Sequence, residues 1–381
     1  MISSLVVILV ISAFILSGCE KKTENTSVKG AAIENYAELT ADQLLEKLVK
    51  DVANVTKDEY VALISTYSNV TIKDDLTLEN NITDEAIKKI DSKAKPSLDE
   101  YLPELLKSDS PQVRGYGISL ITSLLGVSSD NLALAKELIK TETNPYVLCR
   151  AVKSLSNELK DTEVKDFVFK MAENENAHIR VQAAYAIGNS WSKEAQGAVD
   201  KIITLMKDSD VDVRKAAASG SGKLNDEKVI DALVEILNNN DDSDVHASAV
   251  EGLSHLWYDY PFFKNTSEKA YRATMDYYKK TPRNDKVPAW NSLSAFRTVS
   301  TQDTFTEWKT KSTYYNTDEI YNIMVELIKD GDCNWLGRTS AIDVIKNHCG
   351  DEKFNSLKEI IDGLTDAKAS LVKSSYESKA K

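Results

Sequence analysis

Apolar and polar positions along the chain repeat with a period of 32 to 34 residues. The apolar residue that anchors each repeat has a polar residue three positions before it, suited to capping a helix, and a small residue four positions after it. The anchors are Val113, Val147, Ile179, Val213 and Val245. Small side chains at one helical position allow a neighbouring helix to approach closely. A period this regular predicts a protein built from stacked repeats.

Each repeat is predicted to contain two helices. Residues 198–206 and 229–237, which precede the polar caps, have the i, i+3, i+4 apolar spacing of a partner helix. Further helix starts are predicted at Thr40, Thr56 and Ser97, where a hydroxyl is followed three residues later by Gln or Glu. We therefore predict an all-α fold, an α-solenoid (superhelix) of stacked antiparallel helix pairs.

The repeat resembles the HEAT family, and more closely its shorter HEAT-like variety, whose signature is an acidic or amide cap, then Val-Arg, Ala and Leu-Gly. One unit matches through Asp210, Val213, Arg214, Ala217 and Gly222, and another through Asn176, Ile179, Arg180, Ala183, Ile187 and Gly188. The resemblance implies a structural ladder between arginines and acidic turn residues of adjacent repeats. The ladder residues expected here are Arg114, Arg180, Arg214, Asp210 and Asn176.

The regularity of the repeat changes along the chain and suggests its organisation. Residues 39–95 are expected to be a helical N-terminal capping region, and residues 96–255 the regular HEAT-like repeats. Residues 256–330 form an aromatic-rich, irregular part, and residues 331–381 a C-terminal repeat and helical tail. Gly220 and Gly222 lie within a predicted helix, where each glycine costs roughly 1 kcal/mol relative to alanine, so this unit is expected to be locally weak.

The N-terminal residues predict the cellular location of the protein. Residues 1–18 contain no charge, and their apolar run from Leu5 to Leu16 is too short to span a membrane, as in a signal peptide. Leu16-Ser17-Gly18-Cys19 resembles the lipobox of bacterial lipoproteins. The resemblance implies cleavage before Cys19, attachment of lipid such as palmitate to Cys19, and display in the cell envelope outside the cytoplasm. Residues 19–38 are expected to be a flexible tether.

Charge and cysteine content restrict the classes of partner. The chain has 47 Lys and Arg against 59 Asp and Glu, a net charge of −12, which disfavours nucleic acid. The thiols other than Cys19 are Cys149, Cys333 and Cys349, which we expect to be buried and unpaired. A helix between Cys333 and Cys349 would separate them by about 24 Å, too far for a disulfide.

The sequence shows no arrangement of residues typical of catalysis or metal binding. There are four histidines, and His246 and His255 would face opposite sides of a helix. Neither Cys-x-x-Cys nor His-Glu-x-x-His occurs, and the Gly220-Ser221-Gly222-Lys223 segment lacks the first glycine and the hydroxyl of a phosphate-binding loop. We therefore expect no metal, no cofactor apart from the lipid, and no enzymatic activity.

The irregular part is rich in aromatic residues: residues 256–321 contain 15 of the 29 in the chain. They are interpreted either as bulky filling for irregular helices or as a recognition surface, because Tyr and Trp combine large contact area with a polar edge. The candidate partner-binding residues are Trp257, Tyr258, Tyr260, Trp290 and Trp308. If they fill the core, the binding face is expected on the second helices of the regular repeats, near Gln182, Tyr185 and Lys215.

The function expected from these features is a membrane-anchored extracytoplasmic scaffold or adaptor that binds a protein partner. One alternative is a glycan-binding surface protein that uses the aromatic segment. Another is an enzyme of the lyase type, because some HEAT-like repeat proteins are lyases that act on bilins. Exposure of the aromatic side chains distinguishes the glycan-binding interpretation from a filled core.

Overall fold

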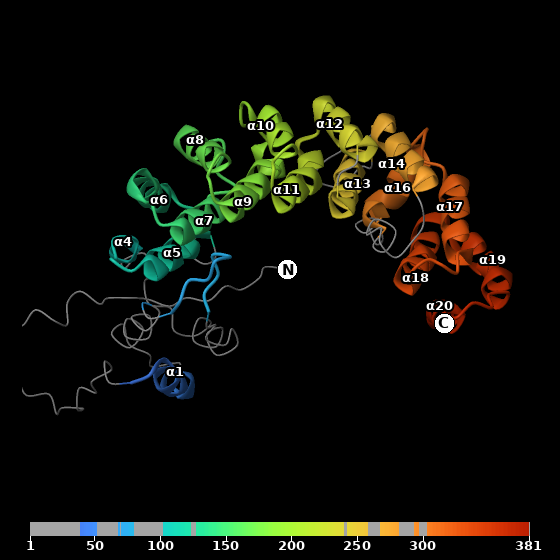
Figure 1. The fold of residues 1–381 in the computed structure, drawn as a ribbon, viewed down its shortest axis with the longest axis horizontal. Coiled ribbons are helices and arrows are strands. Elements are labelled where there is room, and N and C mark those ends of the chain that lie inside the picture. Colours follow the sequence, from blue (N-terminus) through green and yellow to red (C-terminus); the bar gives the residue numbers. More distant parts are fainter. Residues whose placement is uncertain are drawn as a thin grey trace, which may run out of the picture. The chain divides into compact units, whose positions relative to one another are not determined.

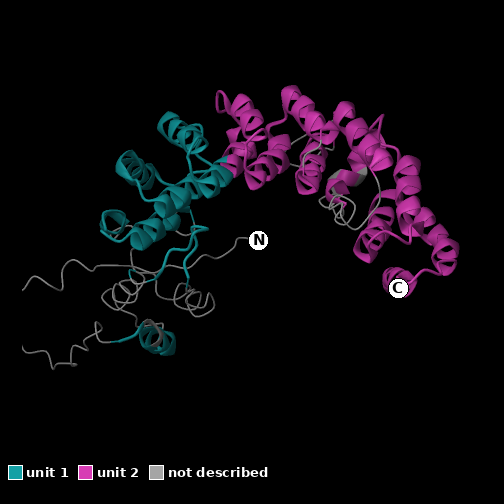
Figure 2. Cartoon of the chain, viewed as in Figure 1, with its two compact units in different colours: residues 1–183 teal, residues 184–381 magenta. Residues whose placement is uncertain are grey.

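The computed structural model of the chain describes residues 39–51, 68, 70–79, 102–122, 127–239, 242–257, 267–281, 293–296 and 303–380. Over these residues the protein is an all-α solenoid of stacked antiparallel helix pairs, as predicted, with one isolated antiparallel bridge between Ile72 and Leu78. The chain divides into two compact units, residues 1–183 and 184–381 (Figure 2). The division falls inside the block that the sequence predicts to be regular.

Unit 1 contains two rows of helices (Figure 1). The first helices of the pairs neighbour one another in one row, and the second helices neighbour one another in the other row. The first row comprises α4 (Leu102–Leu106), α6 (Ser129–Thr141) and α8 (Thr162–Met171), and the second comprises α5 (Pro111–Leu120) and α7 (Pro145–Ser154), after which α9 (Ala177–Ile187) runs across the unit boundary.

Unit 2 begins with the same arrangement. Its first-row helices are α10 (Ala198–Leu205), α12 (Glu227–Asn238) and α14 (Glu268–Lys280), and its second-row helices are α11 (Val211–Ser221) and α13 (Ser243–Trp257). Short helices η6 (Ser190–Ser192), η7 (Gly222–Leu224) and η8 (Ser294–Phe296) interrupt the rows. The unit continues with α16 (Asp303–Lys311), α17 (Thr317–Lys329), α18 (Trp335–Val344), the π-turn η9 (Ile345–Cys349), α19 (Asp351–Asp362) and α20 (Ala369–Lys379).

The repeated residues form the core. All five anchors, from Val113 to Val245, are 0% exposed, and the small residues Ala151, Ala183, Ala217 and Ala249 are equally buried. Polar residues begin the second helices: the side chain of Asp210 accepts hydrogen bonds from the amides of Asp212 and Val213, and that of Asn176 from the amide of His178. The period in the sequence is therefore the period of helix caps and core contacts.

Glycines set the contact between second-row helices in unit 2. A Cβ atom on Gly252 would overlap the carbonyl oxygen of Ala218, and one on Gly222 would overlap the carbonyl oxygen of Gly252. A Cβ atom on Gly220 would lie 3.1 Å from the carbonyl oxygen of Gly188, a tight contact rather than an overlap. The expectation that Gly220 and Gly222 weaken their repeat is therefore incomplete. Gly222 allows the backbone of η7 to pack against α13, and Gly220 allows α11 to approach Gly188, where side chains would hinder both contacts.

Gly252→Ala should lower the free energy of unfolding by about 1–3 kcal/mol, although alanine favours helix, because the new methyl group must displace a backbone carbonyl. Urea unfolding followed by circular dichroism measures the effect. Gly363→Ala is the matched control, since a Cβ at Gly363 meets its nearest atoms at 3.4 and 3.5 Å, which is ordinary contact. Equal stability of the two variants would contradict the close approach.

The N-terminal capping region is only partly described. Helix α1 (Ala41–Lys50) begins with the predicted capping box, in which Thr40 Oγ1 accepts from the amide of Gln43 and Gln43 Oε1 accepts from the amide of Thr40. The predicted starts at Thr56 and Ser97 lie outside the described residues. Residues 70–79 are not helical and contact α5 of the same unit through Gln112, whose side-chain amide donates to the carbonyl of Val70 at 2.7 Å.

Candidate functional site

The aromatic part of unit 2 is a core where the structure describes it. The side chains of Trp257 and Trp308 are 0% and 6% exposed, so the prediction that these two residues contact a partner is wrong. Helices α13, α14 and α16 and the short helix η8 each contribute bulky rings that pack against one another here. Tyr258, Tyr260 and Trp290 lie outside the described residues, and for them the prediction stands untested.

Four rings of the described residues, from α14, η8, α16 and the residues before α17, surround Trp257. Its indole is edge-on to Tyr271 with centroids 5.4 Å apart, and it stacks on Tyr315 at 6.0 Å. Trp308 contacts both Trp257 and Tyr315, with centroid separations of 6.2 and 5.1 Å. The hydroxyl of Tyr314 donates to the carbonyl of Trp257, which ends α13. This arrangement connects α13 to α14, α16 and the start of α17, and it leaves neither tryptophan face available to a sugar.

His348 lies at the edge of the same cluster and is 1% exposed. Its Nδ1 is 2.6 Å from the hydroxyl of Tyr315, and Lys309 Nζ donates to its backbone carbonyl at 2.7 Å. Burial lowers the pKa of His348 to about 3, and burial also lowers the pKa of His255 to about 4. Both imidazoles are therefore neutral in the folded protein near pH 7, and they act as core residues rather than as proton carriers at the surface.

Acid should weaken unit 2 through these histidines. A histidine whose pKa is near 6.5 unfolded and depressed when folded stabilises the fold fully above pH 6.5, and this contribution is lost as the pH falls towards the folded pKa. We expect His348 alone to cost about 2 kcal/mol of stability between pH 7 and pH 5. In urea titrations over this range, His348→Gln should reduce the slope of stability against pH. Equal slopes for the wild type and His348→Gln would refute the assignment.

The ladder arginines donate hydrogen bonds to backbone carbonyls of the turn in their own repeat. Nη1 of Arg114, Arg180 and Arg214 donates in each case to the carbonyls of the residues six and five positions earlier, at 2.7–3.1 Å. Arg114 also forms a two-point ion pair with Glu142 of the following turn, with N–O distances of 2.6 and 3.1 Å. The guanidinium thus satisfies carbonyls left open where the first helix ends and, at Arg114, connects adjacent repeats.

The C-terminal repeat uses a variant of this bonding that the sequence does not reveal. Arg338 is completely buried, donates through Nε to the carbonyl of Ile328 at 2.8 Å, and pairs through both Nη atoms with Asp366 at 2.7 and 2.9 Å. The carbonyls of Asp332 and Cys333 are bonded instead by Lys368 Nζ. The bond from Arg338 holds the pKa of Asp366 at about 2. The sequence signal for the Arg338–Asp366 pair is its spacing: the acidic residue follows the arginine by 28 positions, as Glu142 follows Arg114.

The second-row helices present one side to solvent in each unit. In unit 1, Arg150 and Lys153 of α7 lie on that side, and in unit 2 it carries Asp212 and Lys215 of α11, which pair at 3.0 Å. Large exposed aromatic side chains occur at Tyr185 (53%) and Trp191 (64%). Gln182 is half-buried. Gln182, Tyr185 and Lys215 are the residues near which the alternative binding face is expected.

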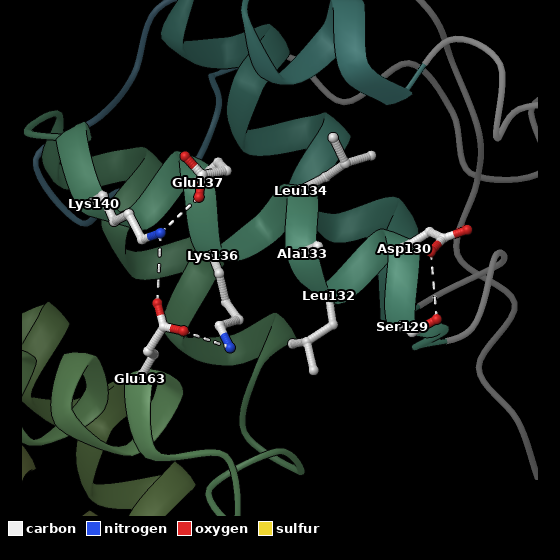
Figure 3. A pocket seen from close by; sticks show the side chains of 9 residues that line it. All are labelled: Ser129, Asp130, Leu132, Ala133, Leu134, Lys136, Glu137, Lys140 and Glu163. Carbon is white, nitrogen blue, oxygen red and sulfur yellow. Dashed lines mark hydrogen bonds and ion pairs between the residues drawn. The ribbon is translucent and has the colours of Figure 1, made fainter.

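The first-row helices of unit 1 border an open pocket of about 660 Å³ between α6 and α8 (Figure 3). Lys136 lies 2.7 Å from Glu163, and Lys140 lies 2.6 Å from Glu137 and 3.6 Å from Glu163. The bond to Glu163 raises the pKa of Lys136, while Lys136 lowers that of Glu163. Because each lysine has a carboxylate partner, this surface offers little net charge to a ligand.

The remaining candidate chemistry is limited. No group of three His, Cys, Asp or Glu side chains is placed to hold a metal ion within the described ranges. Cys333 is buried as expected, but Cys149 and Cys349 are partly exposed, and none of the three forms a disulfide within the described residues. Among the helices that the structure describes, none is both long enough and apolar enough to cross a membrane. Cys19, the predicted lipid-attachment residue, lies outside the described residues.

Comparison with known proteins supports the repeat assignment. A family model described as HEAT repeats matches residues 191–254, which comprise α10 to most of α13. The chain therefore contains HEAT-like repeats. A search of curated proteins finds no match. Among solved structures, the chain is similar to an engineered protein from the Northeast Structural Genomics Consortium, with 16% sequence identity, a TM-score of 0.39, and coverage of 90% of this chain and 82% of that one.

Proposed function

We propose that the protein is a lipid-anchored scaffold of the bacterial cell envelope, displayed outside the cytoplasm, that binds a protein partner along its second-row helices. The observation that carries the proposal is the arrangement of those helices. In each unit one side of the row is fixed by buried Val, Ala and Gly residues, while the other side carries half-buried and exposed polar side chains. A rigid row of helices with an open polar side is suited to binding an extended partner.

The burial of Trp257 and Trp308 favours this proposal over glycan binding, because a stacked sugar requires an exposed ring face. It also moves the expected binding surface away from the aromatic segment, towards the second-row helices. No observation on the described residues favours the lyase alternative.

The anchor is tested by Cys19→Ala. Without the thiol, no acceptor for the lipid remains, so the variant should accumulate as an uncleaved precursor and incorporate no labelled fatty acid. The wild-type protein should incorporate the label and remain in the membrane fraction at high salt, because two acyl chains bury enough CH₂ groups, at roughly 0.8 kcal/mol each, for stable anchoring. Equal labelling of both proteins would refute lipid attachment at Cys19.

A further inference from the structure

We infer that the surface where α5 and α7 lie side by side binds an acidic segment of the protein partner, with Arg150 and Lys153 of α7 as the residues that contact its carboxylates. This inference rests on the proposed function and adds the chemistry of the partner. It depends on how Arg150 is held, on the charges of the two helices, and on the contrast with the first-row helices of the same unit.

Arg150 is positioned by an aromatic platform that joins the two helices. The ring of Tyr146 lies directly against Gly115 of α5, so closely that a Cβ at Gly115 would overlap it. The guanidinium carbon of Arg150 lies 5.2 Å from the centroid of this ring. Tyr146 is 2% exposed and serves to hold Arg150 rather than to touch a ligand. A guanidinium oriented by a ring loses less conformational freedom when it binds a carboxylate through two hydrogen bonds.

The two helices carry only positive charge. Neither Pro111–Leu120 nor Pro145–Ser154 contains Asp or Glu, although the chain has 59 acidic residues. Arg114 is already paired with Glu142, whereas neither Arg150 nor Lys153 forms an ion pair within the part of the chain that the structure describes. Lys153 follows Arg150 by three residues, so the two side chains are neighbours on the helix surface.

The first-row side of unit 1 has the opposite character. Lys136 and Lys140 of α6 are neutralised by Asp161, Glu137 and Glu163. The contrast between balanced charge on that side and unpaired positive charge on α7 indicates a surface kept available for an anionic ligand. Arg150 is half-buried and Lys153 is exposed, so the guanidinium is held against the helix surface while the ammonium group reaches into solvent.

The small size of the positive patch in an acidic chain distinguishes between a short acidic peptide and an extended anionic surface. A membrane of anionic lipid or a nucleic acid is an extended anionic surface that would also approach acidic residues outside a patch of two cations, in a chain whose net charge is −12. A short acidic peptide segment contacts the patch alone. The observations therefore favour an acidic protein segment.

The test uses the full chain in detergent and a fluorescein-labelled octaglutamate peptide, with binding followed by fluorescence anisotropy at about 0.15 M salt, where charges more than about 8 Å apart are screened. Arg150→Glu/Lys153→Glu should weaken binding at least about tenfold, and Arg150→Lys, which keeps the charge but not the planar two-point geometry, should weaken it a few fold. The matched control, Lys160→Glu/Lys170→Glu, changes the net charge equally at exposed positions off these two helices and should stay within about twofold of wild type.

Three results would overturn the inference: no binding of octaglutamate by the wild type, equal weakening by both double variants, or preference of the wild type for phosphatidylglycerol vesicles over the peptide. Circular dichroism and thermal melting establish that each variant is folded before its affinity is compared. If the peptide test fails, lipid labelling at Cys19 and contact with a partner in cells are still expected. Failure of this inference is therefore distinguishable from failure of the proposed function.

Discussion

Trp257→Ala should lower the free energy of unfolding by about 3–5 kcal/mol, because the indole is fully buried and its loss leaves a cavity that four neighbouring rings cannot close. The loss should appear in urea unfolding of the full chain, followed by far-ultraviolet circular dichroism. The effect is large because Trp257 ends α13 and touches rings from α14, η8, α16 and the residues before α17.

Trp191→Ala is the control for this experiment. The same side chain is removed there from a position that is 64% exposed, and we expect a change within about 0.5 kcal/mol. If Trp257→Ala unfolded at the same urea concentration as the wild type, the aromatic segment would not be a core, and its interpretation as a recognition surface would be restored.

Arg338→Met should cost about 3–5 kcal/mol, because it leaves the carbonyl of Ile328 and the carboxylate of Asp366 without their principal partner while keeping most of the apolar volume. Thermal melting and urea unfolding measure the loss. Lys207→Met provides the comparison, since Lys207 and Glu235 form an ion pair whose side chains are 59% and 61% exposed, and exposed pairs contribute between 0 and about 1 kcal/mol. Similar losses from both substitutions would show that burial of Arg338 has no energetic consequence.

The repeat could be predicted from the sequence because it depends on residues that act locally and recur. Val213 and its equivalents are buried, Asp210 caps its helix, and Ala217 lies at a helix contact, each as its position in the repeat requires. The period in the sequence reports all three, so the solenoid follows from spacing alone.

The aromatic segment could not be interpreted in the same way, because the exposure of Trp257 depends on where η8 and α16 return to α13, and no period in the sequence gives that position. The role of Gly252 is likewise set by a partner helix 34 residues away, at Ala218. The platform formed by Gly115, Tyr146 and Arg150 was missed for the same reason. A glycine and a tyrosine in equivalent parts of neighbouring repeats are the only sequence signal for it.

Photocrosslinking in intact cells is the most direct test of the central claim, that a protein partner binds along the second-row helices. A photoreactive amino acid is introduced singly at Ser119, Lys153 and Ser219 on second-row helices, and at Lys140, Lys170 and Glu235 on first-row helices. The account predicts a discrete adduct of higher mass from second-row positions and none from first-row positions. Adducts confined to the first-row positions would contradict it.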